Sequence, residues 1–327
     1  MRLLKKVSTL HLAVAALVAT WLLIIQGAFV RATGSGAGCG RHWPTCNGEV
    51  VPLSHTTESF IEFSHRLLSL VILLFGAWLV WRAFGERRQN KGLWVTALAS
   101  FVLLLNEAFL GALTVLWGLT GDNVSMARGL MVASHLVNSL LLVGGLSLVY
   151  FFARNPDAKL RWRGQWGLLT VLVVGIFSML LLMFSGGIAS MGNTMFPSES
   201  LAQGIAQDFN SEAHLLIRLR VLHPVLGMTV GTYLLVLLGL TWWLKPDANV
   251  KRVSRYLAGT YVAQLVIGLL NLLLLAPVFV QLLHLATATA IFAQLTLLAI
   301  TALTSPATRT QPLPQMDRAI EQMEQAT

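Results

Sequence analysis

The sequence predicts an all-α integral membrane protein whose eight transmembrane helices form two tandem four-helix bundles. Three observations lead to this prediction. Apolar residues make up 55% of the 327 residues and charged residues only 11%, with a mean hydropathy of +0.69, a composition typical of membrane proteins. Eight apolar runs are long enough to cross a bilayer. The last four runs repeat the first four in the same orientation, which predicts a pseudo-two-fold axis along the membrane normal.

Each apolar run is expected to be a helix, because lipid cannot satisfy the hydrogen bonds of an open backbone. The first run follows a basic segment but is too long for the apolar part of a secretory signal, and seven more runs follow it. The predicted helices cover roughly residues 9–30, 60–83, 93–116, 130–153, 166–189, 219–244, 256–275 and 278–303.

The basic residues sort to one side of these helices. Of the 23 Lys and Arg, 17 lie at the N-terminus, in the loops after the second, fourth and sixth runs, or in the C-terminal tail. The positive-inside rule places this side, with both termini, in the cytoplasm. The net charge of +9 therefore indicates orientation in a membrane rather than a nucleic-acid partner. No Arg- and Ser-rich transit peptide precedes the first run, so we expect a bacterial cytoplasmic (inner) membrane.

Two further segments can be assigned from composition and position. Residues 306–327, rich in Gln, Pro and charge, are expected to form a disordered cytoplasmic tail. Cys39 and Cys46, the two cysteines of the chain, fall in the first external loop, where a disulfide is the natural interpretation. This bond could be a structural staple or a redox-active pair that handles electrons. A zinc site with His42 is an alternative, although the usual short spacing between the cysteines is absent.

An internal repeat relates residues 1–155 to residues 156–305, with four predicted helices in each half. Offsets of about 150 to 158 residues bring four polar or glycine positions of one half onto those of the other. The aligned pairs are His65 with His223, Glu107 with Gln264, Gly111 with Gly268, and His135 with His284. Each half therefore carries one histidine on its second helix and one on its fourth.

The four repeated histidines are candidate metal ligands. All lie about six to nine Å from the external ends of their helices, at about 1.5 Å per residue. Two opposed imidazoles from neighbouring helices of a four-helix bundle can hold a haem iron axially, or some other metal. A lone transmembrane histidine is more often a hydrogen-bonded helix contact, but four in symmetric positions favour a ligand role. Zinc or copper would ask for further ligands at similar depth, and none recurs in both halves.

The halves differ one turn before the first histidine of each. Glu62 lies one turn before His65 on the same helix face. The matching position before His223 is Arg220. A carboxylate beside one histidine pair and not beside the other indicates a reactive site and a cofactor site. The alternative is that Glu62 only forms an i, i+4 ion pair with Arg66, worth a few tenths of a kcal/mol.

Several motifs are shared with one known family. They are "GAFVRATGSGAGC" and "WPTCNG" within residues 27–48, "EFSHR" at 62–66, "LGALTV" in the third run, and the histidines of the fourth, sixth and eighth runs. Through them the chain resembles the haem A synthase family along all eight runs. The resemblance implies an oxidoreductase that converts the methyl group of haem O, through hydroxylated intermediates, to the formyl group of haem A for terminal oxidase biogenesis.

The resemblance also implies a role for each candidate residue. The N-terminal half would hold the substrate haem near His65 and His135, with Glu62 as the essential carboxylate. The C-terminal half would bind haem b as cofactor through His223 and His284. Cys39 and Cys46 match the external cysteine pair of many members. A second pair, which some members carry before the sixth helix, is absent from the segment 192–218 of this chain.

Two other classes of protein are left open by the residues themselves. A di-haem electron-transfer protein resembling a quinol-linked cytochrome b needs the four histidines but no carboxylate beside one haem. A proton-coupled transporter would use Glu62 and Glu107, although its halves would more often be inverted. Glu107 is otherwise expected to be a buried, hydrogen-bonded acid.

Contacts and partners can also be anticipated. Arg31 and Arg66, at the external ends of the first two helices, could meet haem propionates, although snorkelling explains them equally well. The expected partners are haem O as substrate, lipid, a haem O synthase and oxidase assembly proteins. No nucleic acid is expected, and a homo-oligomer is left open.

Overall fold

The computed structural model describes residues 8–52 and 56–304, so the predicted disordered tail 306–327 lies outside them. The described part is helical, and eight of its helical spans are long and apolar enough to cross a membrane. The predicted all-α fold with eight membrane spans is therefore confirmed, and the protein is a multi-pass membrane protein. The pseudo-two-fold relation between the halves stays a prediction.

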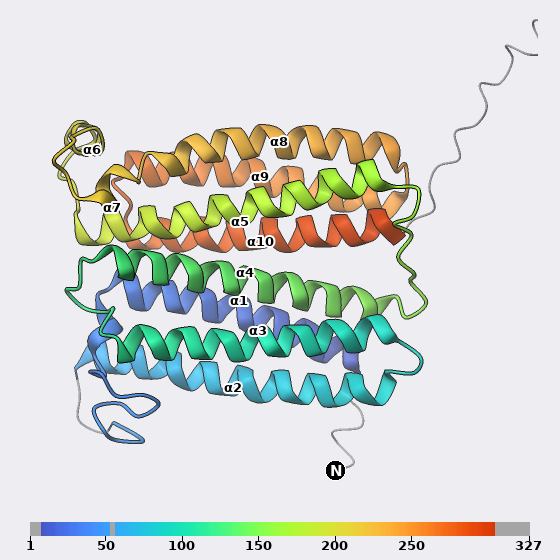
Figure 1. Ribbon diagram of the computed structural model, residues 1–327, viewed down its shortest axis with the longest axis horizontal. Coiled ribbons are helices and arrows are strands. Elements are labelled where there is room, and N and C mark those ends of the chain that lie inside the picture. The colour runs from blue at the N-terminus through green and yellow to red at the C-terminus, as the bar shows by residue number, and fades with distance from the viewer. Residues whose placement is uncertain (1–7, 53–55, 305–327) are drawn as a thin grey trace, which may run out of the picture.

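The first four long helices pack into one bundle, which occupies the lower half of Figure 1. In this N-terminal bundle, α1 contacts α2 and α4, and α3 contacts α2 and α4. Its core consists of apolar side chains such as Leu12, Ile72 and Leu142. The helices are α1 (Thr9–Ala32), α2 (Thr57–Glu86), α3 (Lys91–Leu116) and α4 (Met126–Arg154), with a short 3-10 turn, η1 (Ser35–Ala37), after α1.

The other four long helices form the C-terminal bundle in the upper half of the same view. Here α5 contacts α8 and α10, and α9 contacts α8 and α10. Two short helices, α6 and α7, precede α8 at the end of the bundle where α5 finishes (Figure 1). The bounds are α5 (Trp166–Met195), α6 (Leu201–Asp208), α7 (Leu215–Arg218), α8 (Leu222–Leu244), α9 (Ala248–Leu273) and α10 (Val278–Thr304).

The two bundles share a close junction, formed where α4 contacts α5 and α10 and where α1 contacts α10. The Trp21 indole of α1 donates a hydrogen bond of 3.0 Å to the carbonyl of Ala286 in α10. A side chain at Gly187 of α5 would place its Cβ 2.8 Å from the Cα of Ala133 in α4. Because the backbones approach this closely, the junction between the two bundles is tightly packed along α4 and α5.

Several helices extend beyond the apolar runs that predicted them, and the longest extensions are at the start of α9 and the end of α5. Helix α9 begins at Ala248 instead of residue 256, because Asp247 caps it by accepting hydrogen bonds from the amides of Asn249 and Val250. Helix α5 continues to Met195 instead of ending at residue 189. Hydropathy marks only the part of a helix that lies in hydrocarbon, so helical turns in the polar interface are missed.

Candidate functional site

A single cavity of about 1320 Å³ extends through both bundles. Sites for one drug-sized ligand typically measure about 300–1,000 Å³, so this cavity has room for more than one. All four repeated histidines line it, together with Glu62, Glu107, Gln264, Arg31 and Arg66. The structure thus brings every titratable residue of the predicted haem sites to one continuous space.

His223 and His284 face each other in the C-terminal bundle. Their ring centroids are 6.1 Å apart and the rings are nearly perpendicular, at 82°. A metal lies about 2 Å from each imidazole nitrogen that binds it, which sets two opposed ring centroids about 6 Å apart. His223 Nδ1 lies 3.2 Å from the carbonyl of Leu182, a contact that orients the ring and leaves Nε2 for a ligand role. The separation of this pair is therefore compatible with two imidazoles that would hold a metal such as a haem iron.

The other two histidines belong to the N-terminal bundle. His65 on α2 and His135 on α4 both line the cavity. Nδ1 of each ring is buried and has no hydrogen-bond partner among the described residues. An unpaired buried polar atom is costly, so both rings are suited to a bound group that would use them. Within the described ranges no three His, Cys, Asp or Glu side chains cluster around a point, which agrees with sites built from histidine pairs.

Each imidazole packs against a glycine on a neighbouring helix. A Cβ built on these glycines would lie 2.8 to 3.7 Å from the Cε1 atom of the histidine, close enough that three of the four contacts leave little or no room for a side chain. The pairs are Gly27 with His65, Gly111 with His135, Gly186 with His223, and Gly268 with His284. The glycines therefore act as flat surfaces that let the rings lie against the helix backbone.

Glu107 contacts His135 within a buried polar network. Its Oε1 lies 3.5 Å from His135 Nε2, and its carboxylate accepts hydrogen bonds from Ser139 and Asn138. In the C-terminal bundle the aligned Gln264 instead lies 3.2 Å from both nitrogens of His284. The repeat therefore places an acid beside one histidine and an amide beside the other.

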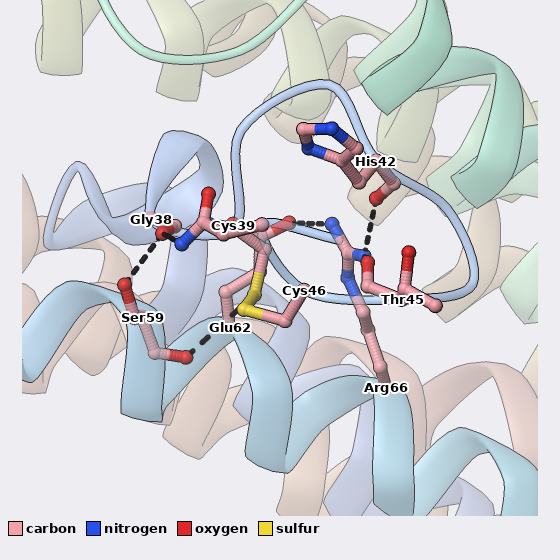
Figure 2. Close-up of polar contacts among 9 residues, drawn as sticks. Gly38, Cys39, His42, Thr45, Cys46, Ser59, Glu62 and Arg66 are labelled. Carbon is pink, nitrogen blue, oxygen red and sulfur yellow. Dashed lines mark hydrogen bonds and ion pairs between the residues drawn. A yellow bond between two sulfur atoms is a disulfide. The ribbon is translucent and has the colours of Figure 1, made fainter. Parts of the chain in front are cut away.

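Glu62 holds the first loop onto α2, as Figure 2 shows. The side chain is buried, Oε2 accepts a 2.9 Å hydrogen bond from the Cys39 amide, and Oε1 forms an ion pair with Arg66. Arg66 in turn donates hydrogen bonds of 2.6 Å to the carbonyls of His42 and Thr45. The ion pair between Glu62 and Arg66, which the sequence suggested as an alternative to a reactive role, is thus present. The Glu62 carboxylate also lines the cavity, as His65 does.

Cys39 and Cys46 form a disulfide, with their Cα atoms 4.4 Å apart, and both residues are fully buried. The predicted bond is therefore confirmed, and the cysteines are not available as zinc ligands in this state. The backbone amide of Cys39 binds Glu62, so the disulfide lies one hydrogen bond away from the carboxylate (Figure 2). The redox role of this disulfide, one of the two interpretations from the sequence, stays a prediction.

A buried arginine at the site was missed by the sequence reasoning. Arg128 of α4 is only 4% exposed and lines the cavity. It lies just before the apolar run that predicted α4, so hydropathy assigned it to a loop. Its position seven residues before His135, which is two helical turns and so the same face, is the signal that could have revealed it.

The fold and these histidines define a multi-pass membrane protein whose helical bundles carry paired imidazoles along one cavity. The profile of the cytochrome oxidase assembly protein family, COX15-CtaA, matches residues 10–296, and the chain belongs to this family. The resemblance predicted from the motifs is therefore confirmed.

Individual relatives agree with the family assignment. A Thermus thermophilus protein named protoheme IX farnesyltransferase is 39% identical over 291 residues, which cover 89% of this chain and 48% of that protein. Heme A synthase of Lysinibacillus sphaericus is 38% identical over 161 residues, 46% of this chain and 50% of the relative. Heme A synthase of Geobacillus kaustophilus is 40% identical over 133 residues, 39% of this chain and 41% of the relative. The chain thus spans about half the length of these relatives.

Proposed function

We propose that this protein is a haem A synthase, an oxidoreductase that converts the methyl group of haem O to the formyl group of haem A. The family match and the heme A synthase relatives support the proposal. One structural observation carries it: a single cavity contains two histidine pairs, and a carboxylate next to a disulfide lies beside only one of them. A pure electron carrier has no use for this asymmetry.

The two bundles take different roles in this proposal. Residues 1–155 hold the substrate haem near His65 and His135, and residues 156–305 hold haem b through His223 and His284. The ring separation of 6.1 Å supports haem ligation in the second bundle, and the buried, unpartnered Nδ1 atoms support a bound group in the first. Haem b, when bound, would supply one-electron redox chemistry.

Glu62 is the proposed catalytic carboxylate. Conversion of a methyl to a formyl group removes hydrogen from carbon, so a base beside the ring can accept a proton at that step. A carboxylate can also stabilise positive charge that develops on the substrate. If water supplies the oxygen atom of the formyl group, an external acceptor takes the four electrons that leave the methyl carbon. If dioxygen supplies that atom, dioxygen is itself reduced. The Cys39 amide and Arg66 fix the carboxylate in place for either course.

The polar edge of the substrate site is proposed to involve Arg31 and Arg66, both of which line the cavity. Arg66 already pairs with Glu62 and with two loop carbonyls. The positive charge of Arg66 is therefore already compensated by Glu62, and a haem propionate near Arg66 would have to share its guanidinium with that carboxylate. Arg31 has no such acidic partner among the described residues and is the stronger candidate for a propionate contact.

We also propose the bacterial cytoplasmic membrane as the location, with both termini in the cytoplasm, on the distribution of Lys and Arg. The substrate chemistry requires a supply of farnesylated haem. The Thermus relative named protoheme IX farnesyltransferase supports a haem O synthase as the functional partner. Product haem A would pass to proteins that assemble terminal oxidases, as the family description indicates.

The test is pigment extraction from membranes that contain a haem O synthase with or without this chain. We expect haem A only where both are present, and haem O where this chain is replaced by its His65→Ala variant. A cytochrome b-like electron carrier would leave haem O unchanged in all samples while still binding haem b. A transporter would change neither the haem content nor the haem type.

A further inference from the structure

Two of the four arginines that line the cavity lack a carboxylate partner. Arg66 forms an ion pair with Glu62, and Arg220 forms one of 2.7 Å with Asp208. Arg31 and Arg128 form no such pair with any residue that the structure describes. Charged groups in a membrane protein are costly unless an opposite charge or a dense set of hydrogen bonds compensates them. Arg31 and Arg128 are therefore suited to binding an anionic group of a ligand.

Arg31 of α1 reaches across the junction into the C-terminal bundle. Its guanidinium donates hydrogen bonds to the Ser190 carbonyl at 3.1 Å and to the hydroxyl of Thr194, both on α5. A third bond of 3.0 Å goes to Oε1 of Gln281 on α10. All three acceptors are neutral, so they orient the guanidinium without neutralising its charge.

Arg128 of α4 is oriented in the same manner. Its Nη1 atom donates to the carbonyls of Gly121 and Asn123 and to the sulfur of Met195. No hydrogen bond from Nε or Nη2 is found within the described ranges. Asp122 and Arg128 make no ion pair within 4 Å among those residues. Arg31 and Arg128 carry the same charge and line the same cavity, so an anion bound between them would offset both charges.

Arg128 lies on the same face of α4 as His135, and Arg31 lies on the same face of α1 as the glycine that packs against His65, both towards the disulfide-loop end. Arg31 follows Gly27, the residue under His65, by one turn or about 6 Å along α1. Arg128 precedes His135 by two turns, or about 10 Å along α4. A ligand placed between His65 and His135 would thus meet both guanidinium groups at one edge.

We infer that Arg31 and Arg128 form a carboxylate-binding site at the junction of the two bundles, which takes the propionates of the tetrapyrrole held by the N-terminal bundle. The inference rests on the proposed function for the identity of that tetrapyrrole. The inferred site includes Arg128. It also gives Arg31 two contacts at once, with the ligand in the N-terminal bundle and with α5 and α10 of the other bundle. Guanidinium groups bind carboxylates through strong, charge-assisted hydrogen bonds.

The test compares binding of metal-free protoporphyrin IX with binding of its dimethyl ester, which has the same ring but no carboxylate charge. The full chain in detergent is titrated while porphyrin fluorescence is recorded. We expect the parent to bind the diacid at least about tenfold more tightly than the diester, since hydrogen bonds to charged groups are strong. Arg31→Gln and Arg128→Gln should each reduce this preference, and the double variant should abolish it.

Two further variants show whether a lost preference for the diacid is specific to the charge at Arg31 and Arg128. Arg154→Gln changes the same residue type on the same helix α4 at its opposite end, and it should keep the parent's preference. Arg31→Lys should retain part of it. Haem b content and thermal unfolding report whether each variant folds.

Equal affinity of the parent for diacid and diester would overturn the inferred site, as would an unchanged preference in the double variant. Neither result would touch the proposed function, which depends on haem A formation in membranes. Conversely, a clear preference for the diacid without haem A formation would reject the proposed function and leave the site standing. Failure to bind either porphyrin would also overturn the inferred site, while haem A formation in membranes would still decide the proposed function.

Discussion

The four repeated histidines share a helix register but differ in the groups that touch them. His223 is oriented by the Leu182 carbonyl, His284 by the amide of Gln264, and His135 by the carboxylate of Glu107. Each also rests on a glycine. Because an imidazole ligand must be held in one orientation to bind a metal well, these contacts support the proposed ligand roles.

Gly186 provides the most specific test of haem b ligation. A Cβ at this position would lie 2.8 Å from Cε1 of His223, so Gly186→Val should displace the ring. Over-packing of this kind costs about 1–3 kcal/mol, which corresponds to haem b retention weakened roughly tenfold or more. His223→Ala and His284→Ala should remove the low-spin haem b spectrum. The measurement is the visible spectrum and the haem content per protein after purification.

Gly167→Val is the matched control, since Gly167 begins the same helix α5 and a Cβ there meets no atom within 4 Å. It should retain the parent's haem b. If both histidine variants keep the spectrum and the content of haem b, the assignment of this pair as axial ligands is wrong.

Among the elements, the disulfide loop and α2 depend on each other. The loop, residues 33–52, is tied to α2 by Glu62, Arg66 and Ser59, whose hydroxyl donates to the Gly38 carbonyl. Gly38 approaches the α2 backbone so closely that a Cβ would lie 2.4 Å from the Glu58 carbonyl carbon. The loop therefore forms an end wall of the cavity rather than a free segment.

The disulfide should accordingly stabilise the folded protein. Cys39 and Cys46 are seven residues apart, and closing a loop of this size lowers the entropy of the unfolded chain by the equivalent of about 2–3 kcal/mol. We expect the Cys39→Ser, Cys46→Ser double variant to unfold at correspondingly lower temperature in detergent. Alkylation of intact cells without reductant, followed by mass mapping, should leave both cysteines unlabelled. Labelling of both would show either that the bond is absent or that the loop lies on the cytoplasmic side.

For the whole molecule, the features that could be predicted are those imposed by the lipid bilayer and those marked by the internal sequence repeat. Lipid forces helices of a set length, so eight apolar runs predicted eight spans. The repeat singled out His65, His135, His223 and His284, and the structure brings all four to one cavity. The cysteine pair was predictable because a thiol pair in an external loop becomes oxidised.

The features that could not be predicted depend on how the helices are rotated and how the bundles dock. Sequence spacing does not show that Gly186 lies under His223 or that Arg31 crosses to Gln281. The first contact depends on how α5 packs on α8 and the second on how α1 packs on α10. Arg128 lies outside its apolar run, so hydropathy separated it from the site. The features that the sequence missed therefore depend on contacts between helices, which no local pattern encodes.

In the proposed function, the N-terminal half is the reactive site because it carries Glu62, whose matching position in the other half is Arg220. The pigment profile of the Glu62→Gln variant, expressed with a haem O synthase, tests this claim most directly. Glutamine keeps the size and can still accept the Cys39 hydrogen bond, but it removes the charge and the base. We predict that this variant, at protein and haem b levels matched to the parent, accumulates haem O or a partly oxidised haem in place of haem A. A normal yield of haem A would contradict the claim and leave Glu62 with the ion pair to Arg66 as its whole role.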